Sequence, residues 1–303
     1  MIKLPPGLDI DNLINDLRSL SWEAADTFHY YAQILKDSQS KSKIIKNGND
    51  EDPVTLADLK VNEIIIKRIN ENYKNINWQI LTEENVKINP NNCNINKDFV
   101  WVIDPLDGTK DFLQGTGNYA MHLGLNFKNK PYLGIVLIPD KDELWITNHD
   151  KVWCENRCGV RKKISLSNKF ALKDMTIVTS KNHRNQALKN LIEKLNFKKI
   201  IVMGSIGCKV ASILRGESDI YICLSMPGES SPKDWDFAAP AAVLKAAGGS
   251  ITNLSNQDLT FGNSNFEQGG IIVASSNNIR HMDICAKIKE VINKNDLYPN
   301  LLN

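Results

Sequence analysis

The strongest local signal for chemistry in the 303-residue sequence is a pair of aspartates, Asp104 and Asp107, that follows an uninterrupted apolar run. The run, 99–103, suits a buried strand, so both carboxylates are expected where that strand ends. Pro105 restricts the backbone between them, and Gly108 lets a ligand approach the main chain closely. Carboxylates on a rigid turn are ligands that Mg²⁺ prefers. Because acidic turns are also common surface loops, this segment alone leaves both interpretations open.

Three further acidic positions lie at expected element boundaries. Glu83 follows the short apolar segment 78–81, where another strand end would carry a carboxylate. Asp58 and Asp236 each stand where a helix is expected to begin, and Thr55 accompanies Asp58. Taken one at a time, a solvated surface pair explains Glu83 and simple helix capping explains the two aspartates.

The elements that must position these residues follow two patterns. In the first half, helices are expected at 8–36 and after 55–58, strands at 78–81, 99–103, 119–127, 131–138 and 142–147, and loops at 37–52 and 85–98. In the second half, strands 175–179, 199–203, 218–224 and 270–275 alternate with helices 184–195, 206–215, 237–247 and 278–293. This change of rhythm predicts two sub-domains, 1–155 with most of the acidic residues and 156–303 with the last one.

Four sequence blocks together carry a family resemblance. They are D-P-V-T-L-A-D at 52–58, E-E at 83–84, W-V-I-D-P-L-D-G-T at 101–109 and W-D-F-A-A-P at 235–240. Their order and spacing resemble the inositol monophosphatase-like superfamily, and most of all its bacterial and plant 3'(2'),5'-bisphosphate nucleotidases. The resemblance implies an α/β fold, the layered αβαβα sandwich of these phosphatases, with the active site between the sub-domains.

The resemblance also implies a metal cluster. Glu83, Asp104 and the Leu106 carbonyl would hold one Mg²⁺, and Asp104, Asp107 and Asp236 would hold a second, with Asp104 bridging. Such an enzyme hydrolyses a phosphomonoester by in-line attack of water without a covalent phospho-enzyme, and is inhibited by Li⁺.

The catalytic residues implied by the resemblance are Asp58, Glu83 and Thr109. Asp58 and Thr109 would orient or deprotonate the attacking water, Asp58 either directly or through a third, weakly held metal. The backbone N–H groups of Gly108 and Thr109 would hold the phosphate, since they are expected to open a helix.

The choice of phosphate ester must come from the second half of the chain. Lys209 and His183 resemble substrate-facing positions of nucleotidases, although a solvated helix face and a surface loop are the ordinary explanations of these two residues. The implied substrate contacts are Leu106, Asp107, Gly108, Thr109, His183, Lys209 and Asp236. Ser205-Ile206-Gly207 instead resembles a pattern of inositol monophosphatases.

We therefore expect a Mg²⁺-dependent nucleotidase that converts 3'-phosphoadenosine 5'-phosphate to AMP, clearing a by-product of sulfate assimilation. The alternatives are an inositol monophosphatase or sugar bisphosphatase with the same metal site, and an inactive metal- or ligand-binding regulator. The intact acidic set argues against the regulator.

Composition limits the partners and the compartment. The net charge is +2, from 37 basic and 35 acidic side chains, so no global field favours a nucleic acid polymer or an acidic membrane. The six cysteines lack zinc-finger spacing and are interpreted as reduced thiols. No signal peptide or membrane-spanning run is found, which predicts a cytoplasmic protein acting on a small molecule as a monomer or homodimer.

Overall fold

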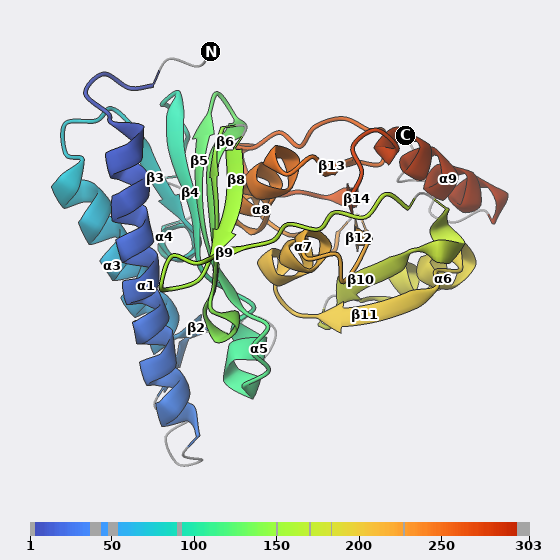
Figure 1. Cartoon of the computed structure of the whole chain (residues 1–303), viewed down its shortest axis with the longest axis horizontal. Helices are drawn as coiled ribbons and strands as arrows, with labels where there is room; N and C mark the ends of the chain where they lie inside the picture. The colour runs from blue at the N-terminus through green and yellow to red at the C-terminus, as the bar shows by residue number, and fades with distance from the viewer. Residues whose placement is uncertain are drawn as a thin grey trace.

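The computed structural model describes residues 4–36, 44–47, 54–89, 93–149, 151–169, 171–182, 184–226 and 228–295. Two large β-sheets alternate with three layers of helices across the molecule (Figure 1). This arrangement confirms the predicted α/β class and its αβαβα sandwich.

The larger sheet has seven strands in the order β3-β4-β5-β6-β7-β8-β9. Their bounds are β3 (Gln79–Thr82), β4 (Phe99–Asp107), β5 (Ala120–Phe127), β6 (Lys130–Ile138), β7 (Glu143–Asn148), β8 (Lys151–Glu155) and β9 (Arg161–Lys162). Strand β3 runs parallel to β4, and the remaining neighbours are antiparallel. Because β4 lies between β3 and β5 and under helices on both faces, all of its residues are buried.

Helices α1 (Ile10–Leu35) and α3 (Leu56–Asn72) cover the outer face of this sheet. Asp9 caps α1 by accepting two backbone N–H groups, and Thr55 caps α3 in a reciprocal capping box with Asp58. The inward stripe of α1 has helical spacing and comprises Leu13, Leu17, Leu20, Ala24 and Phe28. A short ribbon of β1 (Ile45–Asn47) and β2 (Val54–Thr55) leads into α3.

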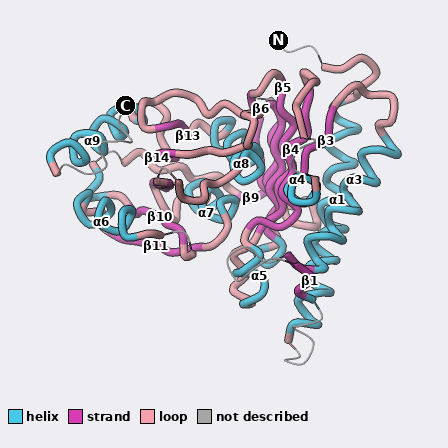
Figure 2. Tube along the Cα trace, turned by 180° about the vertical axis from the view of Figure 1, so that it is seen from behind, coloured by secondary structure: helices cyan, strands magenta, loops and turns pink. Residues whose placement is uncertain are grey.

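The second sheet has five strands in the order β11-β10-β12-β14-β13. Their bounds are β10 (Thr176–Ser180), β11 (Lys199–Met203), β12 (Ile220–Ser225), β13 (Ser250–Asn253) and β14 (Gly270–Ser275). Strand β10 is parallel to β11 and β12, whereas β14 is antiparallel to both of its neighbours. Helices α6 (Gln186–Leu195) and α9 (His281–Lys294) cover its outer face, at the end of the molecule away from α1 (Figures 1 and 2).

Helices α7 (Ile206–Leu214) and α8 (Asp234–Ala246) form the middle layer between the two sheets. Two strand glycines let α8 lie very close to the larger sheet. A Cβ at Gly124 would meet the Cβ of Ala238 at 2.9 Å, and a Cβ at Gly134 would meet the Ala239 carbonyl oxygen at 2.6 Å. The central core that results draws on both halves of the chain, and the boundary near residue 155 stays a prediction.

Most predicted elements are present, with several differences. Residues 83–88, partly assigned to a loop, form α4 (Glu83–Ile88), because the Thr82 hydroxyl accepts the Asn85 N–H at 3.1 Å and starts a helix. Helix α8 begins at 234 rather than 237, since its first turn is polar. The sequence did not predict strands β2, β8, β9 and β13. Of the predicted loop 37–52, residues 45–47 form β1, while 37–43 and 48–52 lie outside the described residues.

In the part of the chain that the structure describes, no helix combines the length and the apolar character needed to traverse a lipid bilayer.

Candidate metal centre

The two aspartates of β4 share one face of the sheet because the strand is irregular between them. Val100 and Val102 pack into the central core, so Asp104 continues the face that points toward α8. In a regular strand, Asp107 would point the opposite way. Asp104 pairs with His122 and Asp107 with Ala120, so β4 has two intervening residues where β5 has one. This β-bulge returns Asp107 to the same face.

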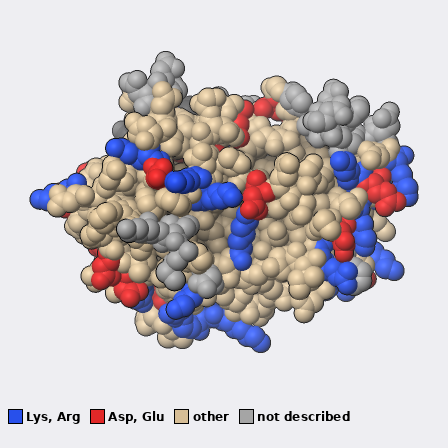
Figure 3. Space-filling model, turned by 90° about the horizontal axis from the view of Figure 1, so that it is seen from above, with Lys and Arg blue, Asp and Glu red and all other residues tan. Residues whose placement is uncertain are grey.

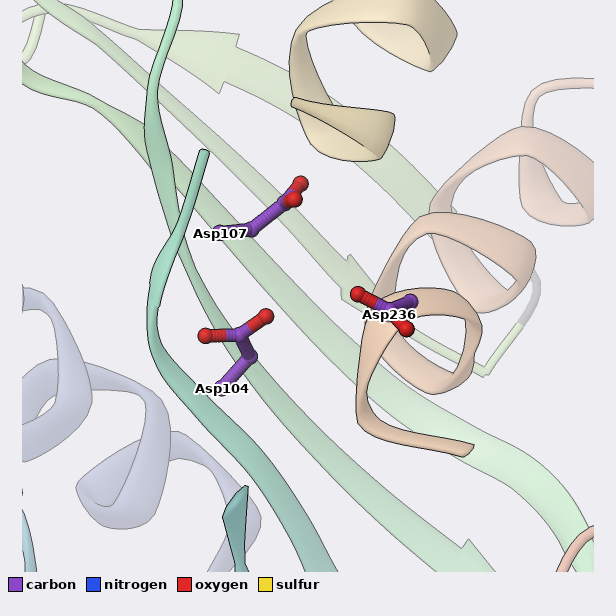
Figure 4. A group of neighbouring side chains, drawn as sticks. All are labelled: Asp104, Asp107 and Asp236. Atoms are coloured by element: carbon purple, nitrogen blue, oxygen red, sulfur yellow. The ribbon is translucent and has the colours of Figure 1, made fainter. Parts of the chain in front are cut away.

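Asp236 approaches from the opposite side, in the first turn of α8. Its Oδ2 accepts the backbone N–H of Lys233 at 2.6 Å, which fixes the side chain at the start of the helix. Asp104, Asp107 and Asp236 each offer an oxygen, and these oxygens lie within 4.8 Å of one another. Figure 4 shows the three carboxylates directed toward a common space.

The electrostatics of this cluster are unfavourable without a cation. Burial raises the pKa of Asp104 well above its usual range, and the charges of Glu83, Asp107 and Asp236 raise it further. Burial, Asp107 and Glu83 likewise raise the pKa of Asp236, although the Lys233 N–H and Lys209 oppose that shift. Buried acids that face one another release protons readily only when a positive charge is supplied.

Glu83, the first residue of α4, lies beside Asp104. Its side chain is 17% exposed, and its Oε1 is 2.9 Å from the ammonium of Lys87. A hydrogen bond with Glu83 also contributes to the raised pKa of Asp104. Glu83 therefore lies next to the cluster, as the sequence predicts, and the short helix that presents it was not expected.

One carboxylate oxygen of Asp107 is held by the other half of the chain. Its Oδ2 accepts the Ser205 hydroxyl at 2.5 Å and the Gly207 N–H at 3.0 Å, both at the start of α7. His122 Nε2 lies 3.2 Å from the same oxygen. Burial lowers the pKa of His122, and the Asp107 charge acts in the opposite sense. With Oδ2 engaged, Oδ1 is the oxygen left for a cation.

Neither His122 nor the contact of Ser205 with Asp107 was anticipated from the sequence. The available signal was His122 itself, the one imidazole in the otherwise apolar run 119–125.

Asp58 and Thr109 meet at the edge of the cluster. The Thr109 hydroxyl lies 3.2 Å from Asp58 Oδ1 and 3.1 Å from the Leu106 carbonyl oxygen, and it can donate to one of them at a time. Burial raises the pKa of Asp58 to about 7, against the opposing hydrogen bonds from Thr55. An acid with this pKa can exchange a proton near neutral pH.

The turn after β4 has the geometry that the sequence predicts. Gly108 has φ of 91°, a left-handed conformation that favours glycine, and it caps α5 (Thr109–Gln114). The Leu106 carbonyl accepts the Thr109 hydroxyl, but a carbonyl oxygen has two lone pairs and keeps one for another partner.

Lys209 is buried, so the interpretation of this residue as a solvated helix face is wrong. It is 1% exposed, and its ammonium donates to the Gly204 carbonyl and lies 5.2 Å from the centroid of the Tyr221 ring. Burial lowers its pKa, and the charges of Asp107 and Asp236 oppose that shift. A helix that is apolar on all sides, as 206–214 nearly is, was the available sign that the lysine would be enclosed. His183 lies outside the described residues.

The donor set fits divalent cations such as Mg²⁺ or Mn²⁺, since every candidate ligand is an oxygen and the acids outnumber the nearby cations. The structure thus brings together Asp58, Glu83, Asp104, Leu106, Asp107, Gly108, Thr109, Lys209 and Asp236.

The model of the inositol monophosphatase family matches residues 10–293. The chain belongs to this family. Relatives of known sequence agree with that assignment. It is 35% identical over 217 residues to the 3'(2'),5'-bisphosphate nucleotidase CysQ of Buchnera aphidicola, covering 72% of this chain and 75% of that protein. It is 26% identical over 264 residues to the CysQ of Aggregatibacter actinomycetemcomitans, covering 85% and 93%.

Solved structures share the fold of this family member. An IMPase of Thermotoga maritima superposes with a TM-score of 0.70 at 19% identity, over 93% of this chain and 99% of that one. An inositol monophosphatase from Anabaena gives 0.69 at 20% identity, over 93% and 97%. At this identity the likeness concerns the fold.

Proposed function

We propose that this family member is a divalent-cation-dependent phosphomonoesterase that removes the 3'-phosphate from 3'-phosphoadenosine 5'-phosphate, giving AMP and phosphate. The observation that carries the chemistry is the cluster of Asp104, Asp107 and Asp236, two buried acids and one half-buried acid directed at one space. The CysQ relatives, named 3'(2'),5'-bisphosphate nucleotidases, support the nucleotide substrate.

Two Mg²⁺ ions are the proposed cofactor. Asp104, Asp107 and Asp236 would hold one, and Glu83, Asp104 and the Leu106 carbonyl would hold the other. Asp58 would hold a third, weakly bound ion or act on water directly. When bound, such cations supply positive charge that favours attack by water and stabilises the departing ester oxygen.

The chain's own residues orient the reactants around this charge. The Thr109 hydroxyl, between Asp58 and the Leu106 carbonyl, is placed to fix the attacking water. Asp58, with its pKa raised to about 7, is suited to accept the proton that this water loses. The N–H groups of Gly108 and Thr109 would hold the phosphate, and Asp236, Lys209 and His183 would contact the remainder of the substrate.

A small-molecule ester in the cytoplasm is the proposed context. The face seen in Figure 3 carries basic and acidic side chains interspersed, without one continuous basic surface for a nucleic acid polymer. All six cysteines are free thiols, as expected in a reducing compartment.

The decisive experiment measures phosphate release from 3'-phosphoadenosine 5'-phosphate and from inositol 1-phosphate side by side, with Mg²⁺, with chelator, and with or without Li⁺. We expect a higher kcat/KM for the nucleotide, no turnover in chelator, and inhibition by Li⁺. Preference for the inositol ester would favour the alternative indicated by Ser205-Ile206-Gly207. Absence of Mg²⁺-dependent hydrolysis of either ester would favour a regulator without activity.

A further inference from the structure

His122, which the proposed reaction does not use directly, lies between β4 and α8, the two elements that carry the aspartates of the metal centre. His122 is fully buried on β5, the strand paired with β4. Its Nε2 lies 3.2 Å from Oδ2 of Asp107, and its Nδ1 lies 3.3 Å from the carbonyl oxygen of Trp235. Trp235 immediately precedes Asp236 in α8. The His122 ring therefore contacts the Asp107 side chain on β4 and the backbone of α8 next to Asp236.

We propose that His122 is a positioning residue that holds Asp107 in the orientation required for cation binding and ties it to the helix that carries Asp236. This inference rests on the metal centre proposed above.

The contacts around Asp107 show how such positioning works. Ser205 and Gly207 already donate two hydrogen bonds to Oδ2, and the imidazole closes the remaining side of that oxygen. The oxygen facing the ring and the Trp235 carbonyl are both acceptors. A ring protonated at Nδ1 donates to the Trp235 carbonyl, and Nε2 packs against the Asp107 oxygen at 3.2 Å without the geometry of a hydrogen bond. Partners that orient a ligating carboxylate in this way fix its geometry toward the metal.

The His122 ring is closely packed against the start of α7. A Cβ on Gly207 would lie 2.3 Å from His122 Nε2, so the first turn of α7 touches the imidazole only because residue 207 has no side chain. The ring thus fills a gap bounded by α7, α8 and β4, and a smaller or apolar side chain would leave only Ser205 and Gly207 to orient Asp107.

The test is a titration with Mn²⁺ in the absence of substrate. Electron paramagnetic resonance measures the concentration of free ion and so gives the Kd. The variants are His122→Leu, His122→Asn and His122→Gln. The amide nitrogen of Asn occupies the place of Nδ1 and keeps the contact with Trp235, whereas that of Gln reaches the place of Nε2 and keeps the contact with Asp107. We expect Leu to raise the Kd by roughly 10–100-fold. Gln should lie closer to the wild-type Kd than Asn does.

A matched control is His281→Leu, at the start of α9. This histidine is also buried and bonds Ser275 at 2.7 Å and Thr252 at 2.8 Å, outside the metal centre. We expect it to lower the Tm measured in chelator and to leave the Mn²⁺ Kd unchanged. For the His122 variants, the Tm in chelator confirms folding, and Asn and Gln remain informative if Leu does not fold.

A wild-type Kd in a folded His122→Leu protein, or equal Kd values for Asn and Gln, would overturn the inference. Failure of the wild-type protein to bind Mn²⁺, or unchanged binding in Asp104→Asn, would instead contradict the metal centre. Because the assay needs no substrate, a wrong choice of phosphate ester leaves both conclusions untouched.

Discussion

Two groups of acids lie on or against the seven-stranded sheet and have opposite surroundings. Glu143 on β7 is 5% exposed and lies 2.7 Å from Arg215, with Lys162 at 3.5 Å. Glu155 on β8 is 1% exposed and lies 2.5 Å from Arg18. The acids of the metal centre, in contrast, face chiefly one another, and their nearest buried cation, Lys209, donates to a backbone carbonyl.

The difference separates acids that complete the fold from acids that are arranged for a ligand. A buried carboxylate that lacks a cationic partner costs free energy, so a chain keeps several of them together only where something else supplies the charge. The negative charges of Glu143 and Glu155 are compensated by the arginine side chains of Arg215 and Arg18. For Asp104, Asp107 and Asp236, the cations of the metal centre proposed above would compensate the negative charge.

Asp104→Asn should give the largest effect. Loss of several kcal/mol of charge stabilisation corresponds to a fall in kcat of roughly 10³-fold or more. In chelator the same variant should be at least as stable as wild type, since one of the mutually repelling carboxylates has been removed. Steady-state kinetics and thermal unfolding in chelator check both parts. An active Asp104→Asn enzyme would be incompatible with a bridging role for this residue.

Glu143→Gln should show the reverse pattern. It leaves Arg215 half paired in the interior, and breaking a buried pair costs about 3 kcal/mol. Because Glu143 is not directed at the cluster, kcat and KM should stay close to wild type. Chemical denaturation and the same kinetic assay measure the two quantities. Unchanged stability would show that the pair is not an internal charge compensation of the kind we describe.

Added cation should stabilise the protein through the metal centre and not through the paired acids Glu143 and Glu155. At 100 times the Kd, a bound ion raises the free energy of unfolding by about 2.7 kcal/mol in wild type and in Glu143→Gln. Asp104→Asn should lose most of that gain. The measurement is the Tm over a Mg²⁺ titration, with K⁺ as the control ion. A Tm that does not respond to Mg²⁺ in wild type would contradict the metal centre.

The smallest effect is the pH dependence of the metal-free protein. Burial raises the folded pKa of Asp58 to about 7, above its unfolded value. The folded state therefore binds the proton more tightly, and stability present at acid pH is lost as the pH rises toward 7. We expect a loss on the order of 1–2 kcal/mol from about pH 5 to pH 7 in chelator, reduced in Asp58→Asn. Denaturant midpoints at several pH values would test it, and stability that rises across this window would oppose it.

The acidic residues were accessible from sequence because each stands next to a strong local pattern. Asp104 and Asp107 end a wholly apolar run, and Asp236 opens an apolar helix, so their element types could be assigned without neighbours. The fold class followed from the family resemblance, and the change in element pattern along the chain predicted two sub-domains.

Features that depend on contacts between distant segments were not accessible. The bulge that turns Asp107 toward Asp104 is a property of the pairing of β4 with β5. The apolar character of α7 was a sign that Lys209 would be buried, but its contacts with Gly204 and Tyr221 depend on how the two sheets enclose the helix. The role of His122 required the register opposite Asp104 and the close approach of Gly207.

The placement of Asp236 on the middle helix has a consequence for synthesis of the chain. Asp104 and Asp107 leave the ribosome long before residue 236, so the larger sheet can form while its two aspartates still lack the third carboxylate and the α7 donors to Asp107. The cation that Asp236 would help to hold therefore cannot guide the early steps of folding. Its binding would come late, after α8 has packed against the larger sheet.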